Sequence, residues 1–378
     1  MINKNIKLIL AVVMIVAVIW YIESTKPVIN KKTENISVGV VSNTVVTSID
    51  RTKILAEKAR NFTPAVEIIP GGGFINTPPF KLKDLIGKKV ILVDFWTYSC
   101  INCLRTLPYL KNWYSKYEDA GLVIVGVHTP EFDFEKDYAN VSSTVKKLGI
   151  EYPVVQDNNY ATWAAYNNQY WPHEYLIDID GYVVDDHIGE GGYDQTEKAI
   201  QAALSERADV LNLPKMGDVK IEKPADAIDV TPTGVASPET HFGSTRNIYL
   251  SNGTKGMAGI QDLVIPETIG ANSLYLGGRW NFQDQYASNQ ISQAEIDFRY
   301  SSKNVYFVAS SDLGIDVEVI LDGKPLARDM AGEDVHNGVV SIKENRLYSL
   351  VKGSSYGEHI LKLIVKNRGL RAFTFTFG

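Results

Sequence analysis

The only two cysteines of this 378-residue chain, Cys100 and Cys103, are separated by two residues in the segment Cys-Ile-Asn-Cys. One helical turn brings thiols at this spacing within bonding distance, so the pair can alternate between dithiol and disulfide without unfolding. If a helix begins here, Cys100 meets free backbone N–H groups at the positive helix end, and these favour its thiolate. We therefore expect Cys100 to attack a partner disulfide and Cys103 to resolve the mixed disulfide.

Two other roles of the cysteine pair stay open at this level. A zinc site would need more ligands, and the surrounding segment offers only His128, His173 and His187, none of them paired at a zinc-finger spacing. A purely structural disulfide would close a very short loop and would stabilise the fold only weakly. Redox chemistry is the preferred interpretation, and it needs no cofactor beyond the Cys100-Cys103 disulfide itself.

The cysteines follow a predicted strand in a segment, residues 63–207, that has the pattern of an α/β domain. Runs of β-branched residues predict five strands, at 90–96, 122–128, 153–156, 174–178 and 182–188. Apolar residues at spacings of three and four predict three helices, at 105–121, 137–149 and 193–207. This alternation indicates βαβ units, in which reactive groups gather beyond the carboxyl ends of parallel strands. Cys100 has such a position.

The run ILVDFWTYSCINC at 91–103 resembles the active-site strand and helix start of thioredoxins, and Pro108 matches the helix-kinking proline of that family. The resemblance implies that Asp94 is a buried acid that accepts a proton from the resolving thiol, and burial would suit it to that work by raising its pKa. It also implies that Trp171 and Pro172 form the cis-proline loop, which faces the disulfide and binds a substrate chain as an extended strand.

The middle segment is most similar to the extracytoplasmic branch related to TlpA and ResA, and within it to the C-terminal half of the DipZ family. The matching strings are FWTYSCINCLRTLPYL, GLVIVGVHTPEF and YATWAAYNNQYWPHEYLIDIDG, and the final FTFTFG resembles the end of the β-rich domain that follows in DipZ-like chains. Full-length members also begin with a multi-span CcdA-like electron-transfer domain. The resemblance therefore implies a reductase that receives electrons from a separate CcdA-like or DsbD-like membrane protein.

Three further residues have weaker assignments. Trp96, at the end of the first predicted strand, is expected to bind substrate together with the proline loop. Glu131 either lies near the disulfide, as an acidic residue does in ResA-like proteins, and contacts substrate there, or is an exposed loop glutamate. Arg105 either stabilises the Cys100 thiolate or is a solvated helix residue.

Residues 238–378 have the pattern of a jelly-roll-like β-sandwich, an architecture used by many carbohydrate-binding modules. Eight strands are predicted, at 272–278, 294–300, 304–311, 315–326, 338–343, 346–353, 359–366 and 372–378. The Asp322-Gly323 pair is typical of a hairpin turn. Tyr275, Trp280 and Tyr286 are candidates for a glycan-stacking platform, but aromatic residues in half-buried strands usually fill the core, which is the preferred reading.

The N-terminal segment, residues 1–22, is predicted to be a single-pass membrane anchor. Leu8 to Ile22 is uncharged and follows Lys4 and Lys7, which favour a cytoplasmic N-terminus. The run ends in bulky aromatic residues rather than the small residues of a signal-peptide cleavage site. Residues 23–62 then have no sustained period and are expected to be a spacer, and residues 208–237 are expected to link the two domains.

The composition narrows the function classes. Lys plus Arg number 38 and Asp plus Glu number 44, a formal charge of −6 that does not favour nucleic-acid binding. The sequence as a whole predicts an extracytoplasmic thiol:disulfide oxidoreductase anchored in the cell membrane. The expected direction is reduction, with protein thiol/disulfide substrates. The alternatives are a thiol peroxidase, and a carbohydrate- or protein-binding surface protein with a thioredoxin-like scaffold.

Overall fold

The structure, a computed structural model, describes residues 43–217, 219–228 and 237–378. The predicted membrane anchor over residues 1–22 lies outside these ranges. Within the described ranges, no helix combines the length and the apolar character needed to cross a membrane.

The expected spacer contains a helix, α2 (Asn43–Asn61). Its second half is rich in leucine, alanine, glutamate, lysine and arginine, which are strong helix formers. This local propensity produces a helix where only a spacer was expected. Near its end, the Lys58 ammonium lies 2.6 Å from Asp178 and 2.7 Å from Asp180, and it also pairs with Glu206. Burial lowers the pKa of Lys58, but the three carboxylates more than offset this and raise it to about 12. The end of α2 is therefore attached to the domain that follows.

In the described residues a seven-stranded mixed sheet, in the order β1-β7-β6-β3-β4-β5-β2, forms the first domain. Its central pairs β3–β4 and β4–β5 are parallel, as βαβ units require, whereas β6 and β7 form an antiparallel hairpin at one side. The strands are β1 (Thr63–Pro64), β2 (Phe74–Ile75), β3 (Val90–Trp96), β4 (Leu122–His128), β5 (Val154–Gln156), β6 (His173–Ile177) and β7 (Tyr182–Ile188).

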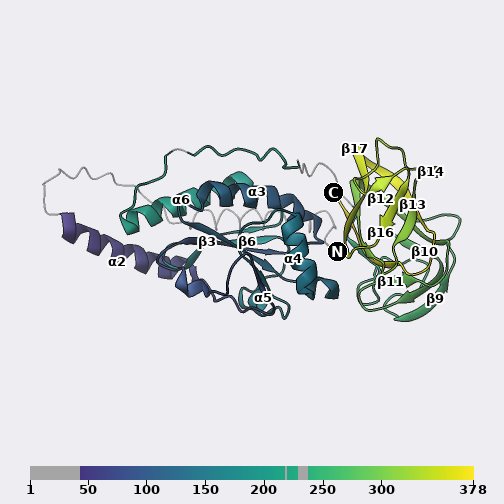
Figure 1. The fold of residues 1–378 in the computed structure, drawn as a ribbon, viewed down its shortest axis with the longest axis horizontal. Coiled ribbons are helices and arrows are strands. Elements are labelled where there is room, and N and C mark those ends of the chain that lie inside the picture. Colours follow the sequence, from purple (N-terminus) through teal and green to yellow (C-terminus); the bar gives the residue numbers. More distant parts are fainter. Residues whose placement is uncertain (1–42, 218, 229–236) are drawn as a thin grey trace, which may run out of the picture. The chain divides into compact units, whose positions relative to one another are not determined.

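Helices cover both faces of this sheet, with α3 and α6 on one face and α5 on the other (Figure 1). The α3 face buries the larger core, which includes Leu92, Trp96, Cys103 and Trp113. The helices are α3 (Ile101–Tyr117), α4 (Tyr138–Lys147), α5 (Ala161–Ala165) and α6 (Tyr193–Leu211), with 3-10 turns η1 (Leu82–Asp84) and η2 (Asp133–Lys136). Because Asp94 alternates with Leu92 and Trp96 along β3, its side chain points to the α3 face.

The predicted elements of this domain agree closely with the structure. Strands β3, β4 and β7 have the predicted bounds, while α3 begins four residues earlier than predicted, directly after Cys100. The sequence analysis missed β1, β2 and α5, which are too short to show a period. Helix α6 ends at Leu211, and Met216, Val219 and Ala227 of the expected linker pack against the core. The first part of that linker is therefore packed against the domain.

In the second domain all pairs of named strands are antiparallel, and the described strands form an eleven-stranded sheet around one apolar core. Two of them, β12 and β17, are long and pair with each other through register shifts that bend them. The strands are β8 (Thr240–His241), β9 (Gly259–Leu263), β10 (Leu274–Phe282), β11 (Ala287–Asn289), β12 (Ala294–Ser310), β13 (Ile315–Leu321), β14 (Lys324–Pro325), β15 (Val335–His336), β16 (Val339–Ile342), β17 (Arg346–Val365) and β18 (Arg371–Phe377).

The all-β prediction for this domain is confirmed, but the strands differ: β8, β9, β11 and β15 were not predicted, and two long strands were each predicted as two. The predicted strands 294–300 and 304–311 are parts of the single strand β12, and 346–353 and 359–366 are parts of β17. Polar residues at the bends interrupt the alternation and make each long strand look like two. The Asp322-Gly323 pair forms the expected turn between β13 and β14, with φ of 51° and 75°.

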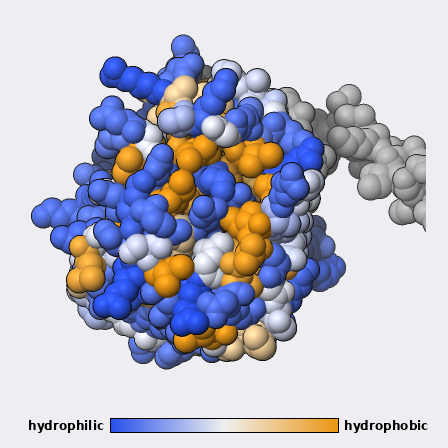
Figure 2. Space-filling model, turned by 90° about the vertical axis from the view of Figure 1, so that its right-hand side faces the viewer, coloured by the Kyte–Doolittle hydropathy of each residue, from blue (hydrophilic) through white to orange (hydrophobic). Residues whose placement is uncertain are grey.

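One of the three aromatic residues considered for glycan stacking lies in the core. Trp280 is completely buried, and its Nε1 donates a hydrogen bond to the Gly277 carbonyl at 3.0 Å, as the preferred core interpretation expects. Tyr275 and Tyr286 are partly exposed, and Tyr286 packs against Phe373 with ring centroids 5.2 Å apart. A glycan site therefore loses Trp280, and a role of the two tyrosines in glycan binding stays a prediction. Figure 2 shows separate apolar patches on a largely hydrophilic face of the molecule.

Candidate active site

The two cysteines occupy different environments at the start of α3. Cys100 is the N-cap residue with an extended backbone (φ −85°, ψ 117°), and its Sγ accepts a hydrogen bond from the Cys103 backbone N–H at 3.5 Å. Both thiols are free, so this is the dithiol form. Cys100 is partly exposed, whereas Cys103 is 1% exposed. Only Cys100 is placed to meet a partner disulfide, which fits the predicted division of roles.

The predicted proline loop lies beside the exposed thiol. The Trp171-Pro172 peptide bond is cis, and the Trp171 carbonyl oxygen lies 3.9 Å from the Cys100 Sγ. The Trp171 ring packs against the Trp163 ring, with ring centroids 4.3 Å apart. The structure thus brings together Cys100, Trp171 and Pro172, although they are some seventy residues apart in the sequence. That this loop holds a substrate strand remains a prediction.

Asp94 is buried beneath the cysteines on β3. It is 1% exposed, and neither of its carboxyl oxygens has a hydrogen-bond partner. Burial raises its pKa to about 8. Burial also raises the pKa of the Cys103 thiol, and the neighbouring Cys100 and the charge of Asp94 raise it further. Asp94 is an acid whose pKa is close to neutral, and its charge influences a thiol that ionises only at high pH. Such an acid can exchange a proton with the Cys103 thiol.

Glu174 is a buried acid that the sequence analysis missed. It lies opposite Asp94 in the register of β6 with β3 and is 1% exposed. The signal was present in the sequence, because Glu174 alternates with Leu176 in the predicted strand 174–178 and so falls on the inward face. A charge at an inward position of a buried strand is unusual and points to a site.

Glu135 is a second missed residue, and it fixes the loop that carries the cysteines. Its carboxylate accepts hydrogen bonds from the Ser99 hydroxyl at 2.7 Å and the Ser99 N–H at 3.2 Å. The same carboxylate accepts the backbone N–H groups of Glu131 at 2.7 Å and Phe132 at 2.9 Å. Burial raises the pKa of Glu135, and these donors partly offset that rise. The residue therefore joins the loop before Cys100 to the loop after β4.

Arg105 has neither of its two predicted roles. It is 4% exposed, and its guanidinium binds the Glu190 carboxylate through two nitrogens, Nε at 2.7 Å and Nη2 at 2.8 Å. A further hydrogen bond of 2.9 Å joins Nη2 to the Asn102 side chain. The guanidinium is thus a buried structural group and not a partner of the Cys100 sulfur. The prediction failed because Glu190 is 85 residues distant in the sequence.

Trp96 is not available to a substrate in this structure. Its side chain is completely buried in the core on the α3 face and meets the His128 ring edge to face, with centroids 5.2 Å apart. The predicted substrate contact is therefore wrong for the dithiol form. The residue supports the end of β3, because the bulky ring fills the space left by Gly126 on the neighbouring strand.

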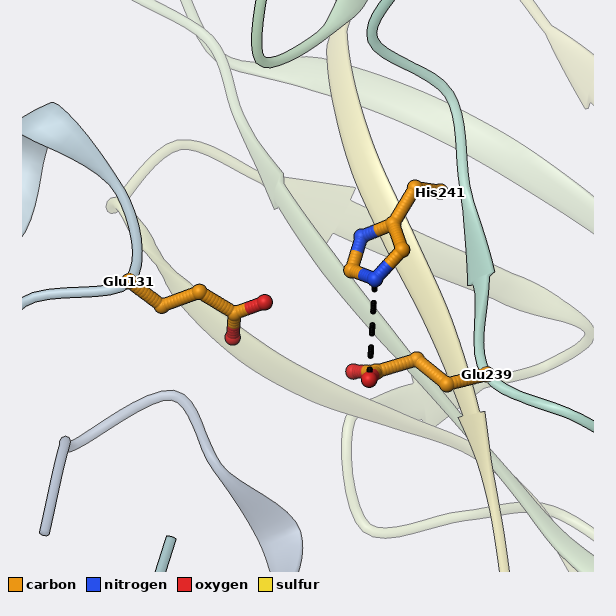
Figure 3. Close-up of side chains that lie close together, drawn as sticks. All are labelled: Glu131, Glu239 and His241. Atoms are coloured by element: carbon orange, nitrogen blue, oxygen red, sulfur yellow. Dashed lines mark ion pairs between the residues drawn. The ribbon is translucent and has the colours of Figure 1, made fainter. Parts of the chain in front are cut away.

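Glu131 is largely buried and is therefore not the exposed loop glutamate of the alternative prediction. Its carboxylate pairs with Arg246 of the β domain at 2.7 Å, and Figure 3 shows it pointing toward Glu239 and His241, which themselves form an ion pair of 3.6 Å. Burial raises the pKa of Glu131 to about 8, to which the charge of Glu239 adds and which Arg246 opposes. The residue contributes to the contact with the β domain, and a role in substrate binding is still a prediction.

Two clusters in the described residues have the ligand types and spacing for a metal ion. In each cluster a carboxylate is already paired with a cationic side chain from outside the cluster. Arg246 binds the cluster of Glu131, Glu239 and His241, and the Lys58 ammonium occupies the cluster of Asp178, Asp180 and Glu206. Neither cluster includes a cysteine, so the zinc interpretation of the cysteine pair gains no ligand from the described part of the chain.

A cleft of 1110 Å³ opens beside the start of α3. On one side it is lined by Tyr98, Ile101 and Leu104, which flank the cysteines in the sequence. Its other wall comes from the β domain, including Asn304 and Tyr306 of β12. The cleft is large enough for several side chains of a bound polypeptide.

Comparisons with known proteins agree with this arrangement. Residues 87–183 match the family model described as "Thioredoxin-like", and residues 237–378 match the one described as "Thioredoxin like C-terminal domain". Protein DipZ of Mycobacterium bovis is 38% identical over 309 residues, which are 81% of this chain and 41% of DipZ. The chain thus spans about two fifths of the length of that relative.

Two shorter relatives match the first domain. Thiol-disulfide oxidoreductase YkuV of Bacillus subtilis is 31% identical over 124 residues, which are 33% of this chain and 83% of YkuV. Thiol-disulfide oxidoreductase ResA of Bacillus thuringiensis is 35% identical over 117 residues, which are 31% of this chain and 64% of ResA.

Proposed function

Because the chain belongs to the thioredoxin-like thiol-disulfide oxidoreductases, we propose that it reduces disulfide bonds of other proteins outside the cytoplasm. The observation that carries this proposal is the asymmetry of the cysteine pair. Cys100 is partly exposed beside the Trp171 carbonyl, and Cys103 is buried next to an acid. This arrangement suits attack by one thiol and resolution by the other.

The reaction transfers two electrons to the substrate. The Cys100 thiolate attacks one sulfur of the substrate disulfide, and the other substrate sulfur leaves and takes a proton. Cys103 then loses its proton to Asp94 and attacks the Cys100 sulfur, which breaks the bond to the substrate and forms the Cys100-Cys103 disulfide. The second substrate thiolate also takes a proton, so the substrate is reduced and the enzyme dithiol is oxidised.

The surroundings of the pair favour the reducing direction. Strong oxidants of this fold owe their potential to a reduced form that is stabilised. Here burial, Cys100 and the charge of Asp94 raise the pKa of Cys103, and the nearby Arg105 guanidinium is bound by Glu190. The Cys103 thiolate therefore gains no charge stabilisation from its surroundings, which supports a pair that gives up its electrons readily.

The cellular setting is part of the proposal. The uncharged segment 8–22, preceded by Lys4 and Lys7, supports a single-pass anchor with the catalytic domain on the outer side of the membrane. A CcdA-like or DsbD-like membrane protein would then return electrons to the oxidised pair. Apocytochromes or oxidised surface proteins are substrates of the required kind.

We assign the β domain to substrate binding rather than to glycan recognition. It contributes one wall of the cleft beside α3, whereas the side chain best suited to stack on a sugar, Trp280, lies in its core. A substrate polypeptide entering this cleft would approach the cysteines between two walls. Such a contact would favour protein substrates over small disulfides.

The test is insulin reduction with dithiothreitol as the electron source. The protein should accelerate precipitation of the insulin B chain, and the Cys100→Ser variant should lose this activity. Cys103→Ser should instead accumulate a mixed disulfide with the substrate. Peroxide consumption by the dithiol form, without insulin reduction, would favour the thiol peroxidase alternative and overturn the proposal.

A further inference from the structure

Asp94 and Glu174, here called the acid pair, bring two carboxyl groups to the same place beneath the cysteines. The two residues are directly opposite each other in the antiparallel register of β3 and β6. Such neighbours point to the same face, with Cβ atoms about 4.5 to 5.5 Å apart. The shared face is the one that buries Cys103, because Leu92 and Leu176, which alternate with the two acids, belong to the same core as that cysteine.

The acid pair is buried with little compensation from hydrogen bonds. Both residues are 1% exposed, neither carboxyl oxygen of Asp94 has a hydrogen-bond partner, and the Thr196 hydroxyl is the donor near the Glu174 carboxyl. On the other side of Asp94, the neighbouring strand β4 presents Gly126, which has no side chain to offer. Two unpaired carboxylates at this distance in a dry site cannot both stay ionised, so one of them keeps a proton.

The groups that face the acid pair from the surrounding elements do not neutralise it. Tyr152 precedes β5, and its hydroxyl has no hydrogen-bond partner. On β7, Asp185 adds another negative charge, and His187 lies opposite Glu174 with its Nε2 unbonded. On α6, Tyr193 and Thr196 present hydroxyl groups, and the Thr196 hydroxyl slightly lowers the pKa of Glu174.

Burial and the charge of Asp94 decide which acid of the pair loses its proton at the lower pH. Burial raises the pKa of Glu174 well above its usual range, and the charge of Asp94 raises it further. Burial alone raises the pKa of Asp94 to about 8, and no charge of Glu174 adds to that rise. Glu174 is thus the acid that holds its proton to higher pH, and Asp94 is the one that can be ionised near neutrality.

We propose that the acid pair titrates as one coupled unit, in which Glu174 keeps a proton while Asp94 accepts the proton of Cys103. The inference rests on the thiol-disulfide exchange proposed above. In the resolving step the Cys103 S–H bond breaks, its proton moves to an Asp94 oxygen, and the thiolate attacks the Cys100 sulfur of the mixed disulfide. Glu174 is a positioning residue, because it acts through Asp94 by limiting the pair to one negative charge.

The first test measures titration without any substrate. In the Cys100→Ser/Cys103→Ser protein, the carboxyl carbons of Asp94 and Glu174 are followed by NMR from pH 4 to pH 11. We expect two steps, separated by more than about one pH unit, with both resonances responding to both steps. In Asp94→Asn the remaining Glu174 step should move to lower pH. Two independent single-step curves would overturn the coupling.

The second test measures the rate of mixed-disulfide resolution against pH in the intact chain. Glu174→Gln mimics the protonated acid, so it should keep the lower midpoint and lose the upper one, at which a second charge forms beside Cys103. Asp185→Asn keeps both acids of the pair, so it should keep both midpoints, with the upper one moved to lower pH because a negative charge near Glu174 is removed. A Glu174→Gln profile equal to that of the wild type would make Glu174 merely structural.

The two tests separate this inference from the proposed function. The NMR titration stays informative if Glu174→Gln fails to fold, because its first part uses the wild-type acid pair. It also stays valid if the chain proves to be an oxidase, since oxidation and reduction share the same proton transfer. Coupled titration with no effect of Glu174→Gln on the resolving step would refute the positioning role alone.

Discussion

Asp94 is held in a site that disfavours its charge, and this has a cost in stability that depends on pH. Its pKa is raised from an ordinary value of 3.8 to about 8 in the folded protein. Between these values the folded state binds more protons than the unfolded state, so the free energy of unfolding falls as pH rises. The stabilising contribution of the protonated acid is complete below about pH 4 and is lost as pH approaches 8.

Asp94→Asn removes this penalty. At pH 8 the variant should unfold at a higher urea concentration than the wild type. Its free energy of unfolding should be larger by at least about 1.4 kcal/mol, which corresponds to one unit of pKa shift. At pH 4 the two proteins should be nearly equal in stability. Urea unfolding at both pH values measures the difference, and equal stability at pH 8 would mean that Asp94 is not buried as described. The same variant should resolve mixed disulfides about a hundredfold more slowly.

At the residue scale, local spacing predicted the reactive atoms and failed for their surroundings. Cys100, Cys103 and Asp94 were found because their spacing follows one strand and one helical turn. Arg105 and Trp96 were misjudged because Glu190 and the core around β3 are distant in sequence. Glu174 was missed for a different reason, since its inward position becomes chemically meaningful only when β6 pairs with β3.

At the scale of elements, the loops around the cysteines depend on one side chain. Glu135, in η2, accepts four hydrogen bonds that join Ser99 to the loop at Glu131 and Phe132. Glu135→Ala leaves buried donors unpaired, at about 1 to 3 kcal/mol. We expect a lower Tm and a fall in insulin reduction, because the loop before Cys100 loses its support.

The neighbouring exposed residue Asp133 provides the control for that variant. Asp133→Ala, in the same turn, removes only a surface ion pair with Lys136 and should change Tm little. If Glu135→Ala and Asp133→Ala behave alike, Glu135 does not support the active-site loop.

The end of α2 should also contribute to stability. Lys58 is the cation for Asp178, Asp180 and Glu206, and Lys58→Met leaves three neighbouring carboxylates without it. We expect a loss of about 3 kcal/mol in the free energy of unfolding, typical of breaking a buried ion pair. Lys53→Met, an exposed change in the same helix, should be nearly neutral. Chemical denaturation of both variants measures the contrast.

The elements themselves were largely predictable, with failures that have physical causes. Strands β3 and β4 are buried on both faces and stand out in the sequence as short segments made mostly of apolar residues, with Asp94 the exception in β3. Helix α2 was read as a spacer because it lacks a strong apolar face, although its residues favour helix. Strands β12 and β17 were each divided in two, because a bend in a long strand resembles a turn in the sequence.

At the scale of the whole molecule, the proposed location makes a direct prediction. A membrane-impermeant maleimide added to intact cells should label Cys100, because this thiol is partly exposed and the catalytic domain is proposed to lie outside. Cys103 should remain unlabelled until the protein is denatured. Labelling that appears only after the cells are lysed would place the domain in the cytoplasm and contradict the proposed location.

The central claim is that this chain donates electrons through Cys100 and Cys103, and the reduction potential of the pair tests it most directly. The full chain is equilibrated with dithiothreitol mixtures at pH 7, and the dithiol fraction is measured by thiol trapping. The proposed reducing role predicts a value near that of thioredoxin, about −270 mV. A value near −120 mV, roughly that of a strong oxidant, would reverse the direction of electron flow and contradict the account.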